Sequence, residues 1–432
     1  MPGWRPTRAL RRVVGLVCLL LIAAVALGRT DLVVLAVPLL TGTLWALRRT
    51  PEVSAEVTVD VADTQVGEGQ QFDATVSVAN PGRVRFVPVS VDVRVGGWLA
   101  TTEEFRPIVT ALPAERAIDV AVRLQARRWG RHRFGSVEVV AAACDGLLVN
   151  RPEPPQPLEV RVHPVNEHFE ADDAMPRAAE LAGTHRSRRP GEGGELVGVR
   201  RFVPGDRLRR IDWRVSLRTR ELHVVATLSD RDAEVVLLLD TLHEAGVSGG
   251  VNGAASVLDV TVRGAASVAE HYLHRGDRVS LLEFGPRHRQ LRAAGGRLHY
   301  QVIRDWLLDT RVVPGALEPQ DWLARPHQLP PNALIVAFTP LLDERSAELL
   351  ARMAWAGRFL IAVDTLPPRA RPAIKSVWRE PATRLWLLER QNTIDELREH
   401  GVPVVAWRGS GSLDEVLRDV SRMALTSRPV SR

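Results

Sequence analysis

Acidic and basic side chains concentrate in one stretch of the sequence, residues 200–225, which reads RRFVPGDRLRRIDWRVSLRTRELHVV. Asp206, Asp212 and His223 are of the residue types that most often transfer protons in enzymes, so an unrecognised enzyme is one interpretation. No pairing of these groups with a nucleophile is visible in the sequence. The neighbouring arginines also favour carboxylates that stay ionised over carboxylates poised to exchange a proton. We therefore do not expect an enzyme.

The same arginines suggest a second interpretation, a nucleic-acid-binding protein that uses the Arg-rich segment 186–220 and the aromatic ring of Trp213. Interleaved acidic residues and the lack of a known RNA- or DNA-binding module argue against it. Arginine is also abundant throughout the chain, where Lys375 is the single lysine, and the net charge of 432 residues is only +6. We therefore expect no nucleic-acid partner.

The third interpretation of residues 200–230 is a structural arm that is clamped onto the domain after it. Asp206 and Asp212 can neutralise arginines through fork-like hydrogen bonds, and Trp213 can anchor the arm by burial. Residues 221–225 can add an edge strand to the next sheet. A partner-binding surface made by the same residues is the alternative. The residues that carry this arm are Arg200, Pro204, Gly205, Asp206, Arg209, Arg210, Asp212, Trp213 and Arg218.

A second group of candidate residues follows two apolar runs in the C-terminal half of the chain. The run at 235–240 ends with Asp240, and the run at 333–339 ends with Thr339. Strand-like and helix-like segments alternate through residues 231–432, which predicts an α/β doubly wound domain with a parallel sheet. Because ligands of such folds usually bind at the carboxyl ends of the strands, Asp240 and Thr339 are candidates for a binding site.

This domain resembles a von Willebrand factor A domain, a family that binds a divalent cation through Asp-x-Ser-x-Ser, a threonine and a later aspartate. Hydroxyl and carboxylate oxygens are the ligands that replace the water shell of such a cation. Here Leu242 and Glu244 occupy the two serine positions, and Pro340 stands where the later aspartate is expected. An atypical cluster of Asp240, Glu244 and Asp343 is the alternative. We expect no metal and no cofactor.

Two uncharged apolar runs, residues 13–28 and 32–47, begin the chain. They predict a transmembrane helical hairpin, so a lipid bilayer is an expected partner. A cleavable signal peptide is the rival, because AVA at 24–26 fits a cleavage site, but the second run would then lack an explanation. Arginines at both ends of the pair predict two spans in the cell membrane, with everything after residue 50 cytoplasmic. These arginines are Arg5, Arg8, Arg11, Arg12, Arg48 and Arg49.

Residues 51–163 alternate apolar and polar side chains with the period of β-strands. The clearest runs are 72–79, 87–95 and 117–124. Several short alternating strands separated by turns predict an antiparallel β-sandwich domain. Residues 164–199 lose this pattern and are rich in charge, glycine and proline, which indicates a linker.

Over almost its whole length the chain resembles the bacterial family called domain of unknown function 58. The signature of that family is matched in register by Arg200, Pro204, Gly205, Asp206, Arg209, Arg210, Ile211, Asp212, Trp213, Ser216, Arg218, Leu222 and Val224. Phe202 replaces the usual tyrosine. The resemblance implies a partnership with a MoxR-type AAA+ ATPase that assists the maturation of other proteins. We therefore expect a membrane-anchored adaptor protein that faces the cytoplasm.

Overall fold

A computed structural model of the chain divides into two compact units, Met1–His163 and Pro164–Arg432. For residues 190–198, 226–228 and 379 it describes the backbone alone. The described residues are 3–103, 105–165, 190–203, 211–228, 234–313, 329–330, 333–368, 370 and 378–407.

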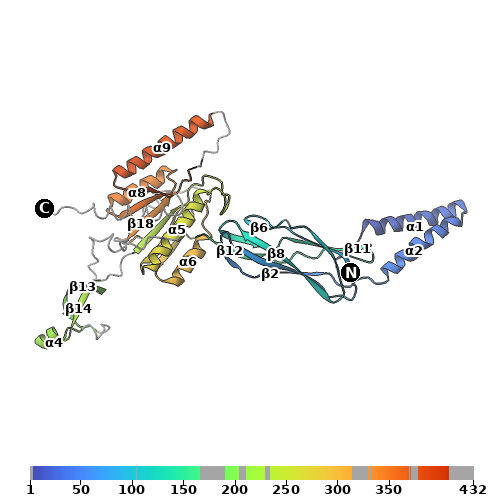
Figure 1. Cartoon of the computed structure of the whole chain (residues 1–432), viewed down its shortest axis with the longest axis horizontal. Helices are drawn as coiled ribbons and strands as arrows, with labels where there is room; N and C mark the ends of the chain where they lie inside the picture. The colour runs from blue at the N-terminus through green and yellow to red at the C-terminus, as the bar shows by residue number, and fades with distance from the viewer. Residues whose placement is uncertain are drawn as a thin grey trace. The chain divides into compact units, whose positions relative to one another are not determined.

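Two apolar helices open the first unit (Figure 1). Helix α1 (Arg8–Leu27) begins after Thr7, whose side chain accepts a hydrogen bond from the Leu10 N–H, and ends at Gly28 in the left-handed conformation. Helix α2 (Asp31–Leu47) follows after a three-residue connection. By length and composition, α1 can cross a membrane, whereas α2 is apolar but only 17 residues long. The predicted apolar runs are therefore helical, and one of them reaches full membrane-spanning length.

The rest of the first unit consists of three sheets, one of which contains a parallel pair, β3 with β12. The five-stranded sheet is ordered β1 (Trp4–Pro6), β11 (Leu148–Asn150), β10 (Val137–Ala143), β5 (Phe86–Val93), β7 (Ile108–Leu112). The four-stranded sheet is ordered β2 (Glu56–Val61), β4 (Gln71–Asn80), β8 (Arg116–Ala126), β6 (Leu99–Thr101). The three-stranded sheet is ordered β3 (Gln65–Gly67), β12 (Leu158–His163), β9 (Gly130–Phe134).

One apolar core joins these sheets, and the alternation in the sequence explains it. In β4, Phe72, Ala74, Val76 and Val78 are all buried, as their period-two spacing predicts. Strand β5 differs at its start, because its register with β7 shifts between Phe86 and Val89. Pro88, within that stretch, has no N–H to donate to the sheet. Phe86 therefore takes the buried position that the sequence pattern gave to Val87.

The second unit contains a six-stranded sheet in which every pairing is parallel except that of the edge strand β17. Numbered by appearance within this sheet, the strands run 3-2-1-4-5-6. The order is β17 (Gln290–Ala294), β16 (Arg278–Phe284), β15 (Glu234–Asp240), β18 (Leu334–Thr339), β19 (Phe359–Asp364), β20 (Val404–Ala406). The carboxyl ends of β15 and β18 therefore lie side by side, at the point where the strand order reverses.

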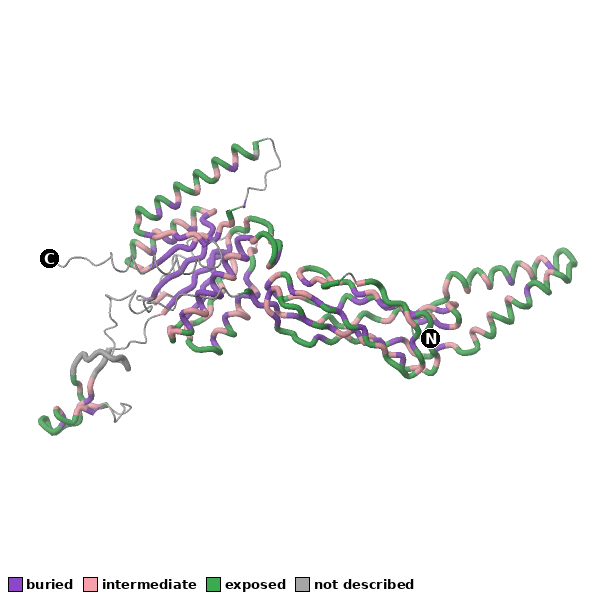
Figure 2. Tube along the Cα trace, in the orientation of Figure 1, coloured by how far each residue is buried: buried purple, intermediate pink, exposed green. Residues whose placement is uncertain are grey.

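Helices cover both faces of this sheet, and its central strands are buried except for Glu234 at the start of β15 (Figure 2). On one face the side chains of Val236 and Ile335 share a core with helices α8 (Glu344–Trp355) and α9 (Arg379–Glu399). On the other face, α5 (Val257–His274) crosses the ring of Phe338 at Gly264, where a Cβ atom would approach that ring to 2.9 Å. Helix α6 (Arg297–Leu307) packs beside α5. Because helices cover both faces of the sheet, the side chains of its central strands are apolar on both faces.

Residues 190–228, which include the family signature, are called the signature segment below, and their described part forms a small structure of its own. Strands β13 (Pro190–Arg201) and β14 (His223–Leu228) pair with each other in a two-stranded antiparallel sheet, and the helix α4 (Trp213–Thr219) precedes β14. The prediction that residues 221–225 add an edge strand to the larger sheet is therefore wrong. Their backbone hydrogen bonds are made within the segment instead. The predicted turn and charges at Pro204, Gly205, Asp206, Arg209 and Arg210 lie outside the described residues, as does 186–189.

Candidate functional site

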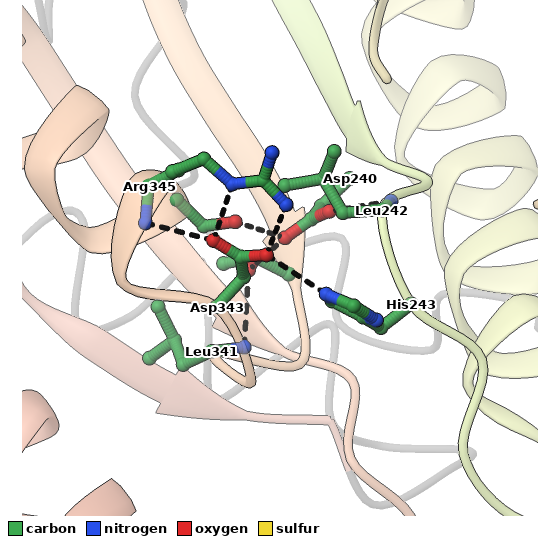
Figure 3. A network of polar contacts seen from close by, with 8 residues as sticks. Asp240, Leu242, His243, Leu341, Asp343 and Arg345 are labelled. Carbon is green, nitrogen blue, oxygen red and sulfur yellow. Dashed lines mark hydrogen bonds and ion pairs between the residues drawn. The ribbon is translucent and has the colours of Figure 1, made fainter. Parts of the chain in front are cut away.

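Asp240 ends strand β15 as a buried carboxylate that accepts three hydrogen bonds (Figure 3). Its Oδ1 accepts from the Leu242 N–H at 3.0 Å. Its Oδ2 accepts from the hydroxyl groups of Thr339, at 2.7 Å, and Ser346, at 2.6 Å. A carboxylate offers about four acceptor positions, so most of its capacity is filled by the chain itself. Asp240 thus ties the end of β15 to β18 and α8.

Burial controls the protonation of this carboxyl group. Desolvation raises the pKa of Asp240 above its ordinary value, because the charged form loses its water. The hydrogen bonds from Ser346, Thr339 and Leu242 act in the opposite direction, and the negative charge of Asp343 adds to the rise. Burial is the largest of these effects.

Asp343 forms a second charged centre at the same edge. It caps the N-terminus of α8, where its Oδ1 accepts from the Arg345 N–H at 2.9 Å. The Arg345 guanidinium binds both carboxylate oxygens, at 2.8 and 2.6 Å, and the His243 ring lies 2.8 Å from Oδ2 (Figure 3). Arg345, the largest influence, lowers the pKa of Asp343 to about 2. Arg345 also interacts electrostatically with Asp240, so the edge contains its own positive charge.

The pH dependence of this ion pair can be predicted. The pKa of Asp343 lies near 2 in the folded chain and about 3.9 in an unfolded one, so the pair stabilises the fold above pH ~4. That stabilisation is lost as the pH falls from about 4 to about 2. Asn is as good a helix cap as Asp, so Asp343→Asn removes the charge and keeps the cap. Denaturant unfolding at pH 3 and pH 7 should show a smaller difference in stability for this variant; an unchanged difference would contradict the assignment.

The positions that correspond to a cation motif are brought together only in part. Asp240 and Thr339 are in direct contact, whereas Glu244 accepts from the Leu258 N–H at the start of α5, at 3.3 Å. In this structure the hydroxyl groups of Thr339 and Ser346 donate to the Asp240 carboxylate, so this carboxylate is bound by donors of the chain itself. Among the described residues, no three His, Cys, Asp or Glu side chains form a group that could hold a metal ion.

A second polar cluster lies at the ends of the neighbouring strands. Glu283, in β16, is fully buried and binds Arg289 through Oε2 and Nε at 2.6 Å. Arg289 stacks over the ring of Trp306, 3.9 Å from its centroid, and donates to the Trp306 carbonyl and the Thr310 hydroxyl at 3.0 and 3.1 Å. The Thr241 hydroxyl donates to Glu283 Oε1 at 3.3 Å. This buried ion pair fixes the loop after β16 against the end of α6.

Some residues of this edge cannot be identified from the sequence pattern. Arg390, on α9, forms an ion pair with Asp364 at the end of β19 and donates to the Pro340 carbonyl at 2.8 Å. Ser346 and Arg345 belong to the first turn of α8, and no sequence pattern reveals the contacts of their side chains. The only local signal was Asp343 preceding an amphipathic helix, which is typical of an N-cap.

The signature segment departs from the predicted clamp. Asp212 caps α4, where its Oδ1 accepts from the N–H groups of Arg214 and Val215 at 3.0 and 3.1 Å; it forms no ion pair with Arg218. Elsewhere in this segment, Arg201 forms an ion pair with Glu221. Trp213 is 62% exposed, so its predicted burial is wrong. The residues that are buried instead are Ile211, Ser216 and Val224.

The exposure of Trp213 changes the expected effect of replacing it. The sequence predicts that Trp213→Ala lowers the melting temperature by several degrees, because a buried indole contributes several kcal/mol. With most of the ring in water, the structure predicts a change in unfolding free energy of about 0.5 kcal/mol or less. Val224→Ala, at a buried position of the adjacent strand, is the matched comparison and should destabilise more. A large effect of Trp213→Ala in thermal unfolding would show that the ring is covered.

Comparisons with known proteins are consistent with the family resemblance over part of the chain. Residues 198–370 match the family described as "Protein of unknown function DUF58". Uncharacterized proteins of Mycobacterium bovis and Mycobacterium tuberculosis are 27% identical over 197 residues, 44% of this chain. The matched region spans 60% of the length of these relatives.

Two solved structures are also similar over short regions. A β-glucosidase from Erythrobacter marinus has a TM-score of 0.16 and 13% identity, over 26% of this chain and 15% of that one. The secreted serine protease VesC from Vibrio cholerae has a TM-score of 0.17 and 9% identity, over 31% of this chain and 27% of that one. Scores and identities this low carry no information about the fold or the activity.

Proposed function

We propose that this chain is a membrane-anchored adaptor protein that binds a partner protein through the carboxyl edge of its parallel sheet and faces the cytoplasm. This proposal rests on how the charged side chains at that edge are hydrogen-bonded and exposed. Its carboxylates, Asp240 and Asp343, are held by donors of the chain itself. His243 and Arg345 remain partly exposed at the surface. Such an edge suits recognition better than catalysis.

The architecture supports assigning the second unit as a von Willebrand factor A-like domain. The strand order 3-2-1-4-5-6, with one antiparallel edge strand, and the contact between Asp240 and Thr339 at the reversal point are both expected for that fold. Unlike a cation-dependent member, this chain places the Arg345 guanidinium where positive charge is needed. Partner recognition here would therefore proceed without a metal.

The first unit would hold this domain near the membrane. Helices α1 and α2 would form a two-span membrane hairpin, and the antiparallel sheets would form a β-sandwich spacer. Helix α1 has the length and composition for such a role. At 17 residues, α2 is slightly short for a hydrocarbon layer of about 30 Å, and flanking arginines can extend their side chains to make up the difference.

The proposed partner is a MoxR-type AAA+ ATPase, which would supply the energy for the assembly or maturation of other proteins. The match to DUF58 over residues 198–370 supports this choice, because the partnership is what that resemblance implies. The adaptor would position the ATPase at the membrane, and the ATPase would carry out the nucleotide-dependent step.

The test is co-purification of the full chain, in detergent or nanodiscs, with the MoxR-type ATPase of the same genome, in ATP and in ADP. His243→Ala should weaken the complex about fivefold or more, because His243 lies exposed at the proposed edge. His274→Ala is the matched control, since His274 ends α5 at the opposite edge of the sheet. No complex in either nucleotide would overturn the proposed partner. Equal effects of the two variants would overturn the proposed face.

A further inference from the structure

The three sheets of the first unit, called the β-sheet unit below, contact the start of α1 and the end of α2 at one place. Strand β1 pairs with β11, and the Thr7 N–H, just before α1, donates to the Leu147 carbonyl at 2.9 Å. On the other side, the Cys144 Sγ contacts the Arg49 carbonyl at 3.5 Å, just after α2. Leu10 and Leu47 both pack against the core of the sheets. The start of α1 and the end of α2 therefore meet at the same turn of the β-sheet unit, between β10 and β11.

Six arginines gather at this junction: Arg5, Arg8, Arg11, Arg12, Arg48 and Arg49. We call them the arginine belt. All six are exposed, and none of them has an acidic partner among the described residues. Only two carboxylates, Glu52 and Asp145, follow closely in the chain or in the β10–β11 turn. The belt is therefore a concentrated and uncompensated positive charge.

Several other arginines of this unit do have acidic partners. Arg94 binds Asp92 and Glu138, Arg123 binds Asp73, and Arg131 binds Glu159, at 2.9–3.2 Å. At the far tip of the helix pair, Arg29 is neutralised by Asp31 at 2.8 Å. The end of the helix pair that joins the sheets therefore carries six arginines without a described acidic partner, whereas the arginine at its opposite tip is neutralised.

An aromatic side chain marks the same level. Trp45, in the last turn of α2, is 73% exposed, and the guanidinium of Arg48 lies 5.7 Å from the centre of its ring. Tryptophan is enriched at the headgroup level of membranes, where its ring contacts lipid and its N–H contacts water. A belt beside such a residue, at the foot of an apolar helix, lies where lipid phosphates would be if the helices are inserted.

We propose that the arginine belt binds the phosphate groups of anionic phospholipids on the surface of the membrane that the helices enter. This inference rests on the membrane anchoring proposed above. The planar guanidinium group binds phosphate oxygens in pairs, which makes arginine well suited to this ligand. Because Leu10 and Leu47 fix the belt against the sheets, bound lipid would also hold the β-sheet unit at a constant height above the bilayer.

The test uses the full chain, solubilised in a neutral detergent and titrated with phosphatidylglycerol or phosphatidylcholine, with bound lipid counted by native mass spectrometry. The wild-type chain should retain phosphatidylglycerol in preference to phosphatidylcholine. An arginine near an anionic membrane surface contributes roughly fivefold in affinity. Arg8→Gln combined with Arg48→Gln should therefore weaken phosphatidylglycerol binding on the order of thirtyfold.

Two exposed arginines at the distal end of the β-sheet unit give a matched control. Arg127→Gln combined with Arg133→Gln removes the same charge away from the belt and should leave lipid binding unchanged. Equal losses in the two double variants, or no preference for phosphatidylglycerol, would overturn the proposal. Retention of the chain in nanodiscs of phosphatidylcholine alone tests the anchoring separately, because neutral lipid suffices for insertion. A chain that enters neutral nanodiscs but shows no lipid preference would contradict the belt and leave the anchoring intact.

Discussion

Replacing Arg289 with methionine should lower the free energy of unfolding of the second unit by about 3–5 kcal/mol and its melting temperature by about 10 °C. Arg289 neutralises Glu283, which is fully buried, so the variant leaves a carboxylate without its counter-charge in the interior. The stacking over Trp306 and the hydrogen bond to Thr310 are lost as well. Thermal unfolding of the full chain, followed by tryptophan fluorescence, measures the effect, since Trp306 lies next to the ion pair.

Two further variants make this result specific. Arg292→Met is a matched control on β17, the strand that begins directly after Arg289, because Arg292 is exposed and forms no described ion pair; it should change stability by about 0.5 kcal/mol or less. Glu283→Leu combined with Arg289→Met removes both charges, and should destabilise less than Arg289→Met alone. If Arg289→Met behaved like Arg292→Met, the ion pair would have no structural role.

The second large effect is expected at Asp240. Asp240→Ala leaves three donors without their acceptor in a buried site, namely the hydroxyls of Thr339 and Ser346 and the Leu242 N–H. Each such group costs about 1–3 kcal/mol when buried without a partner. Because hydroxyl groups can turn toward other acceptors, we expect a total loss of about 3 kcal/mol in denaturant unfolding at pH 7.

Asp240→Asn is the informative comparison because it keeps the shape and one acceptor oxygen. The raised pKa of Asp240 means that the folded chain binds a proton more readily than the unfolded one does, so its contribution falls as the pH rises above about 4. The neutral amide removes this dependence and should cost about 1 kcal/mol or less at pH 7. Equal losses for Ala and Asn would contradict a hydrogen-bonding role. A rise in the melting temperature with Mg²⁺, abolished in Asp240→Asn, would instead establish a cation site.

Local patterns in the sequence predicted the elements of this fold well, since burial on a strand or helix follows from spacing alone. The alternating run 72–79 and the apolar runs before Asp240 and Thr339 are strands within one or two residues of the prediction. The register shift between Phe86 and Val89 was not predicted, because a proline alters backbone hydrogen bonding without changing the apolar pattern. Asp240 and Thr339 could be placed together because parallel strands bring their carboxyl ends to one edge.

The parts that escaped prediction depend on contacts between distant residues. Ser346 reaches Asp240 across 106 positions, and Arg390 reaches Pro340 across 50. Nothing in the local sequence selects these partners over others. Trp213 shows the reverse error, because size and apolarity favour burial but do not supply a surface to be buried against. Polar networks and exposed aromatics are decided by tertiary arrangement, and they were the features least accessible from sequence.

The pairing of β1 with β11 has a consequence for how the chain is made. Trp4, in the first strand, bonds opposite Asn150, so a ribosome must synthesise both helices and most of the sheets before this pairing can form. The first strand can therefore join its sheet only after both helices and β11 have been synthesised. Once joined, the helix pair is connected to the sheets through two separate strands of backbone, at Thr7 and at Arg49. A pull or twist on the β-sheet unit is then shared between two attachments, which prevents it from swivelling about a single tether.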